Sequence, residues 1–282
     1  MRLLEWLIAT YPAAKKTTLR RMVEDGRVRI NGQPARSVRQ AVNQQDIVRV
    51  EQPSRSAAPT LAPLLLIHED ADVLVVNKPA GLLTNTVARE RRATAIGIVR
   101  AYLKQTHPRA RAGVVHRLDR DASGLLVFSK NDAAYVNLKR QFFHHTVQRI
   151  YTAVVHGRPS PPAGTIESRL VELTDGSVRT TRLPNKGDPA TTQYQTLATN
   201  NDLSLLQVTL HTGRKHQIRV HMNQRGHPVV GDTVYGGRKD DKSRLLLAAT
   251  TLAFDHPRTG KRLTFTIAPP VEIARLFPEA TP

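Results

Sequence analysis

The sequence predicts an α+β protein: a large mixed, mainly antiparallel sheet with few helices, and a separate small α/β domain at the N-terminus. Three observations carry this prediction. The chain has 282 residues, which is ample for a main domain and a minor one. Short β-rich runs crowd between a few helical patterns in its larger part. A proline-containing stretch without apolar periodicity precedes that part. We therefore expect domains at 1–50 and 64–282, joined by a flexible linker at 51–63.

The first fifty residues predict two helices followed by short strands. The apolar residues of LLEWLI recur at helical spacing, and Glu5 interrupts the apolar run that a signal peptide needs. TTLRRMVEDG predicts a second helix, with a threonine as N-cap and Gly26 as its end. Asn-Gly after RVRI indicates a hairpin turn, and DIVRVE indicates a further strand.

The larger part predicts many strands and three helices. The strand patterns are DVLVVNKPAG, GLLVFSK, IYTAVVHG, TTQYQTLA, LSLLQVTLHTG and RLTFTIAPP. The helical patterns are confined to TAIGIVRAYLKQ, DAAYVNLKRQF and KHQIRVHMNQRG. Apolar runs are far shorter than the roughly 20 residues that a membrane span requires, so we expect no membrane segment.

The charge of the chain indicates a polyanionic partner. Lys and Arg number 42 against 23 Asp and Glu, which gives a formal net charge of +19. Such a surplus attracts nucleic acid, whereas a generally basic solvated surface and an anionic membrane are the weaker readings. The absence of cysteine excludes a disulfide scaffold and cysteine-ligated zinc, and it fits a cytoplasmic protein.

Arginines are concentrated on the polar side of the expected N-terminal domain. They are Arg20, Arg21, Arg27, Arg29, Arg36 and Arg39. A merely solvated face usually mixes charges more evenly, so we expect this domain to bind RNA or DNA, with the first four of these arginines as contacts. Its segment LRRMVEDGRVRINGQ resembles the small RNA-binding domain that is named after a protein of the small ribosomal subunit.

The segment HRLDRDASGLLVFSK places two carboxylates, Asp119 and Asp121, among arginines at the start of an apolar strand. Most such pairs are structural ion pairs. A partly desolvated carboxylate that a nearby arginine keeps ionised is also suited to act as nucleophile or base. The spacing does not choose between these readings, nor between the two residues.

Five segments, in order between about residues 67 and 270, resemble motifs of the RluA-type pseudouridine synthases. They are VLVVNKPAGLLTN, GVVHRLDRDASGLLVFSK, RIYTAVVHG, TGRKHQIRVHMNQRGHPVVGDTVYGG and LAFDHPRTGKRLTFTIAPP. The resemblance implies conversion of a uridine in RNA to pseudouridine without cofactor or metal. In that reaction uracil is detached from its sugar, turned, and rejoined through a ring carbon. Nothing is added or lost, so the site must supply a carboxylate, a pocket for the loose base, and exclusion of water.

The resemblance also implies roles for individual residues. Asp119 matches the catalytic carboxylate, either as nucleophile toward the sugar or as base for one of its protons. Arg219 matches the arginine that pairs with this carboxylate, although by itself it reads as a surface arginine. Tyr151 matches the tyrosine that stacks on uracil and is a candidate for removing the ring proton. A tyrosine in a strand more often belongs to the core.

Further residues are expected to contact RNA. Arg117 is placed to fill the gap left by a flipped-out uridine, because a planar guanidinium can stack there. His116 is expected to brace the loop, and Arg214 of the TGR motif to bind RNA. Lys78 either reaches an RNA phosphate or holds the Lys-Pro turn, and the sequence does not separate these roles.

Three departures from the family pattern and several rival functions remain. Ala122 replaces a threonine before Ser-Gly, Asn85 stands where a histidine is frequent, and Ala248 occupies another histidine position. These departures favour one rival function, that of an RNA-binding assembly factor whose catalytic site is no longer active. A metal-dependent nuclease is disfavoured, since the histidines have poor ligand spacing and lack a paired acidic cluster. A protein that only binds DNA would leave HRLD and RKHQIR without purpose. We expect a monomeric enzyme acting on ribosomal RNA, with transfer RNA as the alternative and no protein partner.

Overall fold

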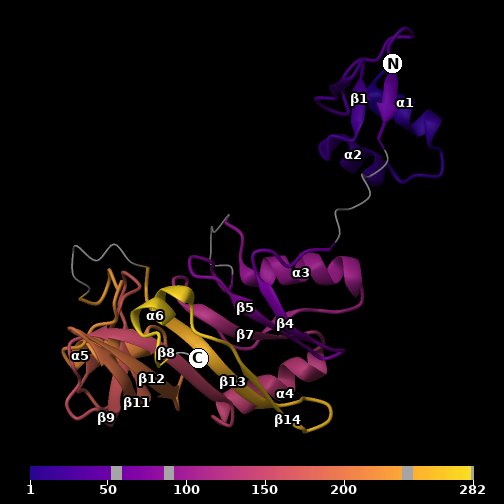
Figure 1. Ribbon diagram of the computed structural model, residues 1–282. Helices are drawn as coiled ribbons and strands as arrows, with labels where there is room; N and C mark the ends of the chain where they lie inside the picture. Colours follow the sequence, from indigo (N-terminus) through magenta and orange to yellow (C-terminus); the bar gives the residue numbers. More distant parts are fainter. Residues whose placement is uncertain (52–58, 86–91, 237–243, 281–282) are drawn as a thin grey trace. The chain divides into compact units, whose positions relative to one another are not determined.

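The computed structural model describes residues 1–51, 59–85, 92–236 and 244–280 (Figure 1). The chain divides into two compact units, Met1–Thr60 and Leu61–Pro282. We describe each unit by itself. Most of the linker expected at 51–63 lies outside the described residues, because 52–58 are not among them.

The N-terminal unit packs two helices against a small sheet. Its elements are α1 (Leu3–Thr10), α2 (Lys16–Glu24), β1 (Val28–Ile30), β2 (Gln33–Pro34) and β3 (Val48–Val50). The strands are antiparallel in the order β2-β1-β3. Both predicted helices and the hairpin are present, and Asn31 and Gly32 take the positive φ angles, 50° and 83°, of the expected tight turn. The predicted threonine N-cap is wrong: α2 begins after Lys15, whose side chain makes no capping bond, so the first threonine already lies inside the helix.

The larger unit contains one mixed sheet. Its strands are β4 (Leu65–Glu69), β5 (Val73–Lys78), β6 (Gly113–Val114), β7 (Ser123–Ser129), β8 (Gln148–His156), β9 (Ala163–Glu172), β10 (Val178–Thr181), β11 (Asp188–Asn200), β12 (Leu203–Leu210), β13 (Leu247–Asp255) and β14 (Arg262–Thr266). The order is β10-β9-β11-β12-β8-β13-β7-β5-β4, with β14 on β13 and β6 on β7. Among these pairs β7 and β13 are parallel and the others antiparallel. The predicted α+β class with a mainly antiparallel sheet is confirmed.

Some elements of this unit were not predicted. Strand β13, LAATTLAFD, is rich in alanine, a residue of low strand propensity, and its place between β8 and β7 comes from tertiary pairing. The statement that helical patterns are confined to three segments is wrong, because α6 (Val271–Leu276) follows the sheet. This helix has six residues, which is too short to show a helical period.

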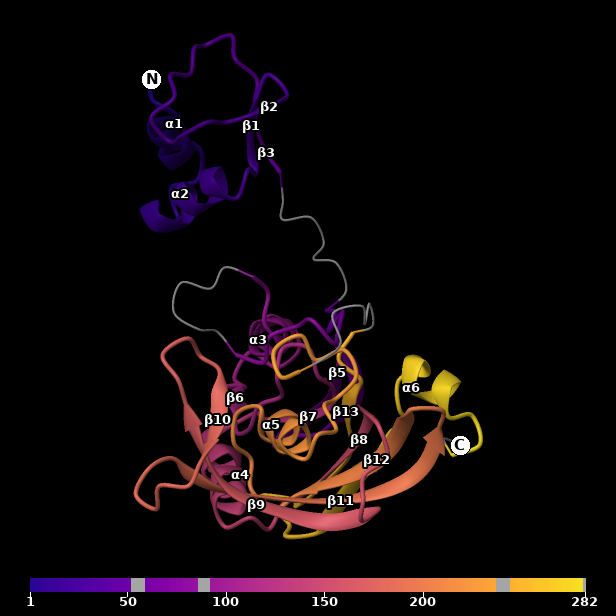
Figure 2. The ribbon, with the colours of Figure 1, turned by 90° about the vertical axis from the view of Figure 1, so that its left-hand side faces the viewer.

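Helices cover both faces of the central strands. Leu74 and Val76 of β5 join the core that includes α3 (Ala95–Thr106) and α5 (Gln217–Gln224), whereas Val73 and Val75 join the core that includes α4 (Asp132–Phe143). Alternate residues of a strand point to opposite faces, so each face is covered by different helices. Figure 2 shows α5 lying against the concave side of the curved strands β9, β11 and β12. Because they are buried on both sides, the central strands read as continuous apolar runs.

Gly124 fixes the point where the charged loop enters the sheet. Its φ is +117°, and a Cβ atom there would lie 2.3 Å from the carbonyl oxygen of Ala249 on β13. Only glycine permits this close approach of two parallel strands. The loop that carries Asp119 is thereby delivered to the α5 side of the sheet, where Leu118 is part of the core with Ile218. No described helix is long and apolar enough to cross a membrane.

Candidate active site

A cavity of about 410 Å³ opens beside α5 in the larger unit. Residues of the loop before β7, the end of α4, strand β8 and the start of α5 line it. Six residues predicted from the sequence are among them: His116, Arg117, Asp119, Tyr151, Arg214 and Arg219. The cavity therefore brings together predicted residues that are up to 103 positions apart, from His116 to Arg219.

Asp119 is the carboxylate that faces this cavity. Its Oδ2 lies 3.4 Å from Nη1 of Arg219, and its side chain is 17% exposed. The side chain of Asp121, the alternative, is 42% exposed and pairs with its neighbour Arg120 through two bonds of 2.9 and 3.0 Å. The two carboxylates thus have different surroundings, and only Asp119 is among the residues that line the cavity.

A second buried carboxylate holds Arg219 in place. Asp232 accepts from Nε and Nη2 of Arg219 at 2.7 and 2.8 Å, and it also accepts from the backbone N–H groups of Val234 and Tyr235 at 3.0 Å. Burial by itself would raise the pKa of Asp232, but the guanidinium and these N–H groups outweigh burial and lower it. Arg219 is therefore fixed by Asp232 and directs its remaining Nη1 at Asp119.

Tyr235 links the same network to His216, the N-cap residue of α5. The Tyr235 hydroxyl accepts from the N–H of Val178 at 2.8 Å and lies 2.7 Å from Nδ1 of His216. Its hydrogen is consequently free to bond Nδ1, which leaves the hydrogen of the neutral imidazole on Nε2. Nε2 lies 4.0 Å from Oδ1 of Asp119. Burial lowers the pKa of His216, while Asp119 opposes that shift.

The Lys-Pro segment braces the backbone on both sides of Asp119. Oγ1 of Thr84 donates to the Leu118 carbonyl at 2.9 Å and accepts from the Leu118 N–H at 3.1 Å. Nζ of Lys78 donates to the carbonyls of Pro79, Leu82 and Arg120 at 2.9, 2.8 and 3.1 Å. The loop that carries Asp119 is thus tied to a segment more than thirty residues earlier in the chain.

This geometry corrects the expectation for Lys78. The residue is fully buried, and its ammonium is surrounded by the three carbonyl groups, so it is not available to an RNA phosphate. Burial lowers the pKa of Lys78 to about 8, against the opposing charges of Asp119 and Asp121. Of the two roles that the sequence left open, the structure supports holding the turn.

Tyr151 and His116 complete the wall of the cavity. Tyr151 projects from β8 and is 7% exposed, and burial raises its pKa to about 12. His116 accepts from the N–H of Val127 through Nε2 at 3.1 Å and stacks on Phe142 with ring centroids 4.5 Å apart. Burial lowers the pKa of His116 to about 3, so this side chain is neutral and braces the loop.

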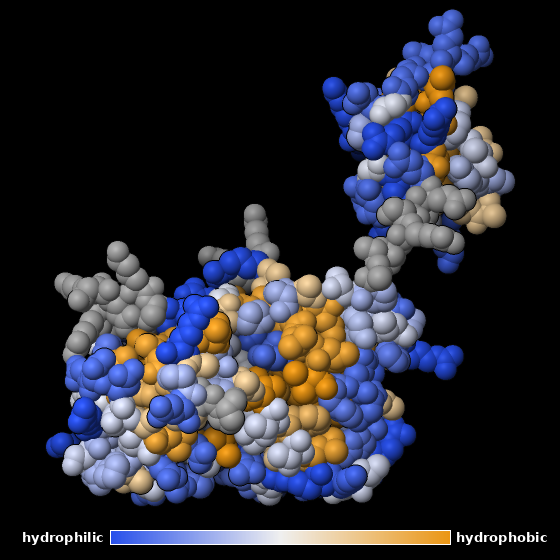
Figure 3. Space-filling model, in the orientation of Figure 1, coloured by the Kyte–Doolittle hydropathy of each residue, from blue (hydrophilic) through white to orange (hydrophobic). Residues whose placement is uncertain are grey.

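The remaining predicted contacts are exposed. Arg117 lines the cavity mouth with no hydrogen bond to another described residue. Arg214 lies 3.7 Å from Asp188. In the N-terminal unit, Arg20 and Arg21 project from α2, and the visible face of this unit is largely hydrophilic (Figure 3).

The other two predicted arginines of that unit have protein partners. Arg27 donates to the Glu51 carbonyl at 3.2 Å. Arg29 pairs with the Glu51 side chain at 2.5 Å, and on β1 it stands opposite Arg49 of β3.

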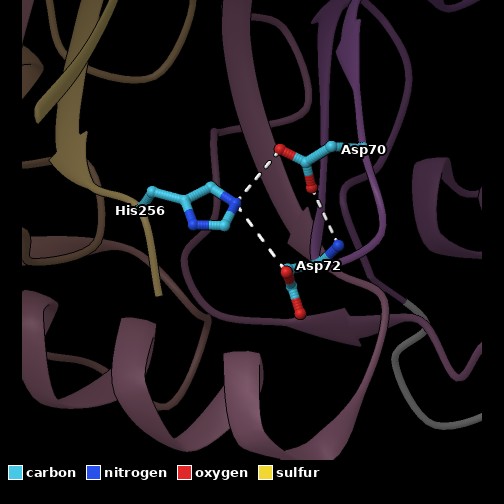
Figure 4. Close-up of side chains that lie close together, drawn as sticks. All are labelled: Asp70, Asp72 and His256. Atoms are coloured by element: carbon cyan, nitrogen blue, oxygen red, sulfur yellow. Dashed lines mark hydrogen bonds and ion pairs between the residues drawn. The ribbon is translucent and has the colours of Figure 1, made fainter. Parts of the chain in front are cut away.

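A cluster of Asp70, Asp72 and His256 lies in the same unit as the cavity (Figure 4). Nδ1 of His256 accepts from two backbone N–H groups, so Nε2 carries the hydrogen and donates toward the aspartates at 3.2 and 3.8 Å. Asp72 is also paired with Arg258 through two bonds of 2.8 Å. A metal ion would have to displace these bonds, and the cluster instead ties β5 to the turn after β13.

The sequence missed several residues of the site. Asp232 and Tyr235 stand in the quoted run GDTVYGG and Thr84 in GLLTN. Nothing in their spacing marks them as partners of Arg219, His216 and Leu118, which lie 13, 19 and 34 positions away. Among the three departures, Ala122 lines the cavity, Ala248 is buried on β13 opposite Ser123, and Asn85 directly follows Thr84.

Comparisons with known proteins fit this geometry. Residues 72–224 match the family model of RNA pseudouridylate synthase, and residues 1–48 match that of the S4 domain. An uncharacterized RNA pseudouridine synthase of Bacillus subtilis, YlyB, is 37% identical over 97% of this chain and 92% of its own length. Ribosomal large subunit pseudouridine synthase D of Zymomonas mobilis is 36% identical over 76% of this chain and 72% of its own.

A solved structure is similar in fold. Human RNA pseudouridylate synthase domain containing 4 aligns with a TM-score of 0.64 at 23% identity, covering 74% of this chain and 90% of that one. All lining residues of the cavity except Leu247 lie within residues 72–224, which the family model matches.

Proposed function

We propose that this chain, which belongs to the RNA pseudouridylate synthase family, modifies uridines of ribosomal RNA through Asp119. The family membership makes the chain an RNA pseudouridine synthase. The observation that carries the assignment is the position of Asp119 in a cavity of about 410 Å³, 3.4 Å from Arg219 and beside buried Tyr151. This arrangement combines a shielded carboxylate, an arginine beside it, and an aromatic wall for a base.

The reaction breaks the bond between the sugar and a uracil nitrogen and forms one between the sugar and a uracil carbon. The hydrogen of that carbon is exchanged for one on the nitrogen, so the overall step is an isomerisation. Asp119 either attacks the sugar carbon or removes a sugar proton. Burial of the neighbouring groups favours the reaction, because water that would intercept the detached base is excluded.

The target uridine must leave its stack to reach Asp119, at a cost of a few kcal/mol. Arg117 is exposed at the cavity mouth, where its guanidinium can stack into the gap that the uridine leaves. Tyr151 supplies the surface on which the extruded uracil stacks. With a pKa raised to about 12, its hydroxyl is protonated at neutral pH, which makes stacking the better supported role.

The N-terminal unit provides general affinity for RNA. Residues 1–51 contain ten Lys and Arg against five Asp and Glu. Arg29 and Arg49 stand directly opposite on neighbouring strands, and although Arg29 pairs with Glu51, the two guanidinium groups concentrate positive charge on this face. A relative named for the large ribosomal subunit favours ribosomal RNA over transfer RNA. This substrate implies a cytoplasmic location, and a cavity lined by a single chain is compatible with a monomer.

Asp119→Asn tests the proposal, with Asp121→Asn as the matched control. Each protein is incubated with ribosomal and transfer RNA that lack modifications, and pseudouridines are mapped at nucleotide resolution. Asp119→Asn should form none while binding RNA with nearly unchanged affinity, since phosphate contacts dominate binding. Asp121→Asn should retain activity.

Three outcomes would count against the proposal. Activity in Asp119→Asn would refute the catalytic role. Modification of transfer RNA alone would refute the proposed substrate. A wild-type chain that binds RNA but modifies none would favour the assembly-factor alternative.

A further inference from the structure

Arg149 is a buried cation that forms no ion pair with any residue that the structure describes. It lies on β8, two residues before Tyr151, is 8% exposed, and lines the cavity. Its Nη2 makes one long hydrogen bond, 3.5 Å, to the carbonyl of His211, and its Nε has no partner among the described residues. Its guanidinium lies 5.7 Å from the centroid of the Phe142 ring. Its five N–H donors are thus largely unused.

The other charged side chains that are buried in the described residues contrast with Arg149. Arg219 is paired twice with Asp232, and Lys130 donates to Glu69 and to the Asp70 carbonyl. Lys78 donates to three carbonyls. An arginine stays charged in proteins, and an unpaired charge is expensive to bury. The site around Arg149 is therefore incomplete without an acceptor.

The surroundings of Arg149 indicate the charge of that acceptor. The titratable groups that face it are His116, His145 and Tyr151, and none of them supplies a negative charge at neutral pH. Lys139, Arg214 and Lys215 add positive charge at the cavity wall. A neutral carbonyl would satisfy one N–H, whereas a phosphate offers two oxygens to the planar fork and balances the charge.

The backbone is also shaped around this guanidinium. A Cβ atom on Gly213 would lie 2.2 Å from Nη1 of Arg149, so the glycine of the TGR motif leaves the space that the arginine occupies. Alternate residues of a strand share a face, with a spacing of roughly 7 Å. A nucleotide whose base contacts Tyr151 consequently has its backbone within reach of Arg149.

We infer that Arg149 binds the RNA phosphate next to the uridine that enters the cavity, and that this contact positions the extruded nucleotide. The inference rests on the proposed function, because it assumes that a uridine is drawn into this cavity. It adds a phosphate subsite inside the cavity to the general affinity of the N-terminal unit.

The test removes the phosphate charge on the RNA and the guanidinium on the protein in turn. The probe is a synthetic stem-loop that contains a uridine modified by the wild-type chain. It is made with native linkages, and with one neutral methylphosphonate on the 5′ or the 3′ side of that uridine. Dissociation constants are measured with the full chain carrying Asp119→Asn, so that no turnover occurs. Arg149→Gln, Arg149→Lys and Arg158→Gln are introduced into this background.

One neutral linkage should weaken binding roughly tenfold or more, as expected for loss of a charged hydrogen bond. The same linkage should change the affinity of Arg149→Gln for the RNA by less than about twofold. In Arg149→Lys, which keeps the positive charge, the neutral linkage should again weaken binding, but by less than in the protein with Arg149. Arg158→Gln is the control: Arg158 is exposed beyond the far end of β8, where it bonds the Asn201 carbonyl, so its loss should leave the sensitivity intact.

Two results would overturn the inference. In the first, a methylphosphonate linkage weakens binding by the same factor whether or not Arg149 is present. In the second, neither methylphosphonate changes the dissociation constant of the Asp119→Asn protein, as expected if the arginine only packs on Phe142. The second result requires only the modified RNAs and the Asp119→Asn protein. It can therefore be obtained even if an Arg149 variant fails to fold. Pseudouridine formation by the wild-type chain on the native stem-loop is a separate readout. If the chain modifies no RNA, the proposed function is refuted and the inference falls with it.

Discussion

Replacing Asp232 with asparagine should separate the structural and catalytic parts of the arginine network. The exchange keeps the shape of the side chain but removes the charge that holds Arg219 through bonds of 2.7 and 2.8 Å. The Asp232 side chain is 0% exposed and that of Arg219 7%, so little solvent can replace the lost partner. Breaking such a buried pair from one side costs about 3–5 kcal/mol.

The expected loss can be measured as a shift of the unfolding temperature. Each kcal/mol lowers the midpoint by about 2–4 °C in a unit of this size, so we expect a decrease of roughly 6–20 °C. Asp72→Asn is the matched control, because Asp72 is also buried and doubly bonded to an arginine. Its partner Arg258 is 66% exposed, and the control should lose only about 1 kcal/mol or less.

Activity should respond differently in the two variants. Without Asp232 the guanidinium is free to turn toward Asp119, and a misplacement of about 1 Å at a reacting group lowers kcat up to about a hundredfold. Single-turnover assays below the unfolding temperature should show this loss in Asp232→Asn and wild-type kcat in Asp72→Asn. Equal melting shifts, or a folded Asp232→Asn with unchanged kcat, would refute the reasoning.

Three further predictions concern binding and pH. Tyr151→Leu should weaken binding of a substrate stem-loop by about 1–3 kcal/mol in the Asp119→Asn background, because base stacking is lost; an unchanged dissociation constant would exclude that role. Deleting residues 1–60 should leave a folded unit whose RNA affinity is lower and less dependent on salt, and a salt slope identical to that of the full chain would argue against RNA contacts in this part. Burial lowers the pKa of His116 to about 3 and that of His221 to about 4 in the folded chain. In the unfolded chain both imidazoles have their ordinary, higher pKa, so the unfolded chain takes up protons at a pH at which the folded chain does not. Stability should therefore fall as the pH decreases from about 6.5 toward 4, and calorimetry should show a flatter pH dependence for His221→Gln than for the control His144→Gln.

The candidate site could be predicted only in part from the sequence. Asp119 and Asp121 flank the same arginine, Arg120, and resemblance to a family was needed to prefer one of them. The structure separates them physically, since one faces the cavity and the other pairs with Arg120 at the surface. Lys78 illustrates the opposite failure: a lysine in a polar motif suggests contact with phosphate, but three carbonyls enclose its ammonium.

The sequence by itself determined those properties that the order of neighbouring residues encodes. Short β-rich runs marked most strands, helical spacing marked the longer helices, and five ordered motifs indicated the family. The tertiary structure alone decided which distant side chains meet. Thr84 reaches Leu118 across 34 positions, and Arg219 reaches Asp119 across 100. Such contacts arise from strand order and helix packing, whose free energy is spread over the whole core. For that reason the buried charge of Arg149 and the hydrogen bonds from Arg219 to Asp232 could be recognised only once the chain was folded.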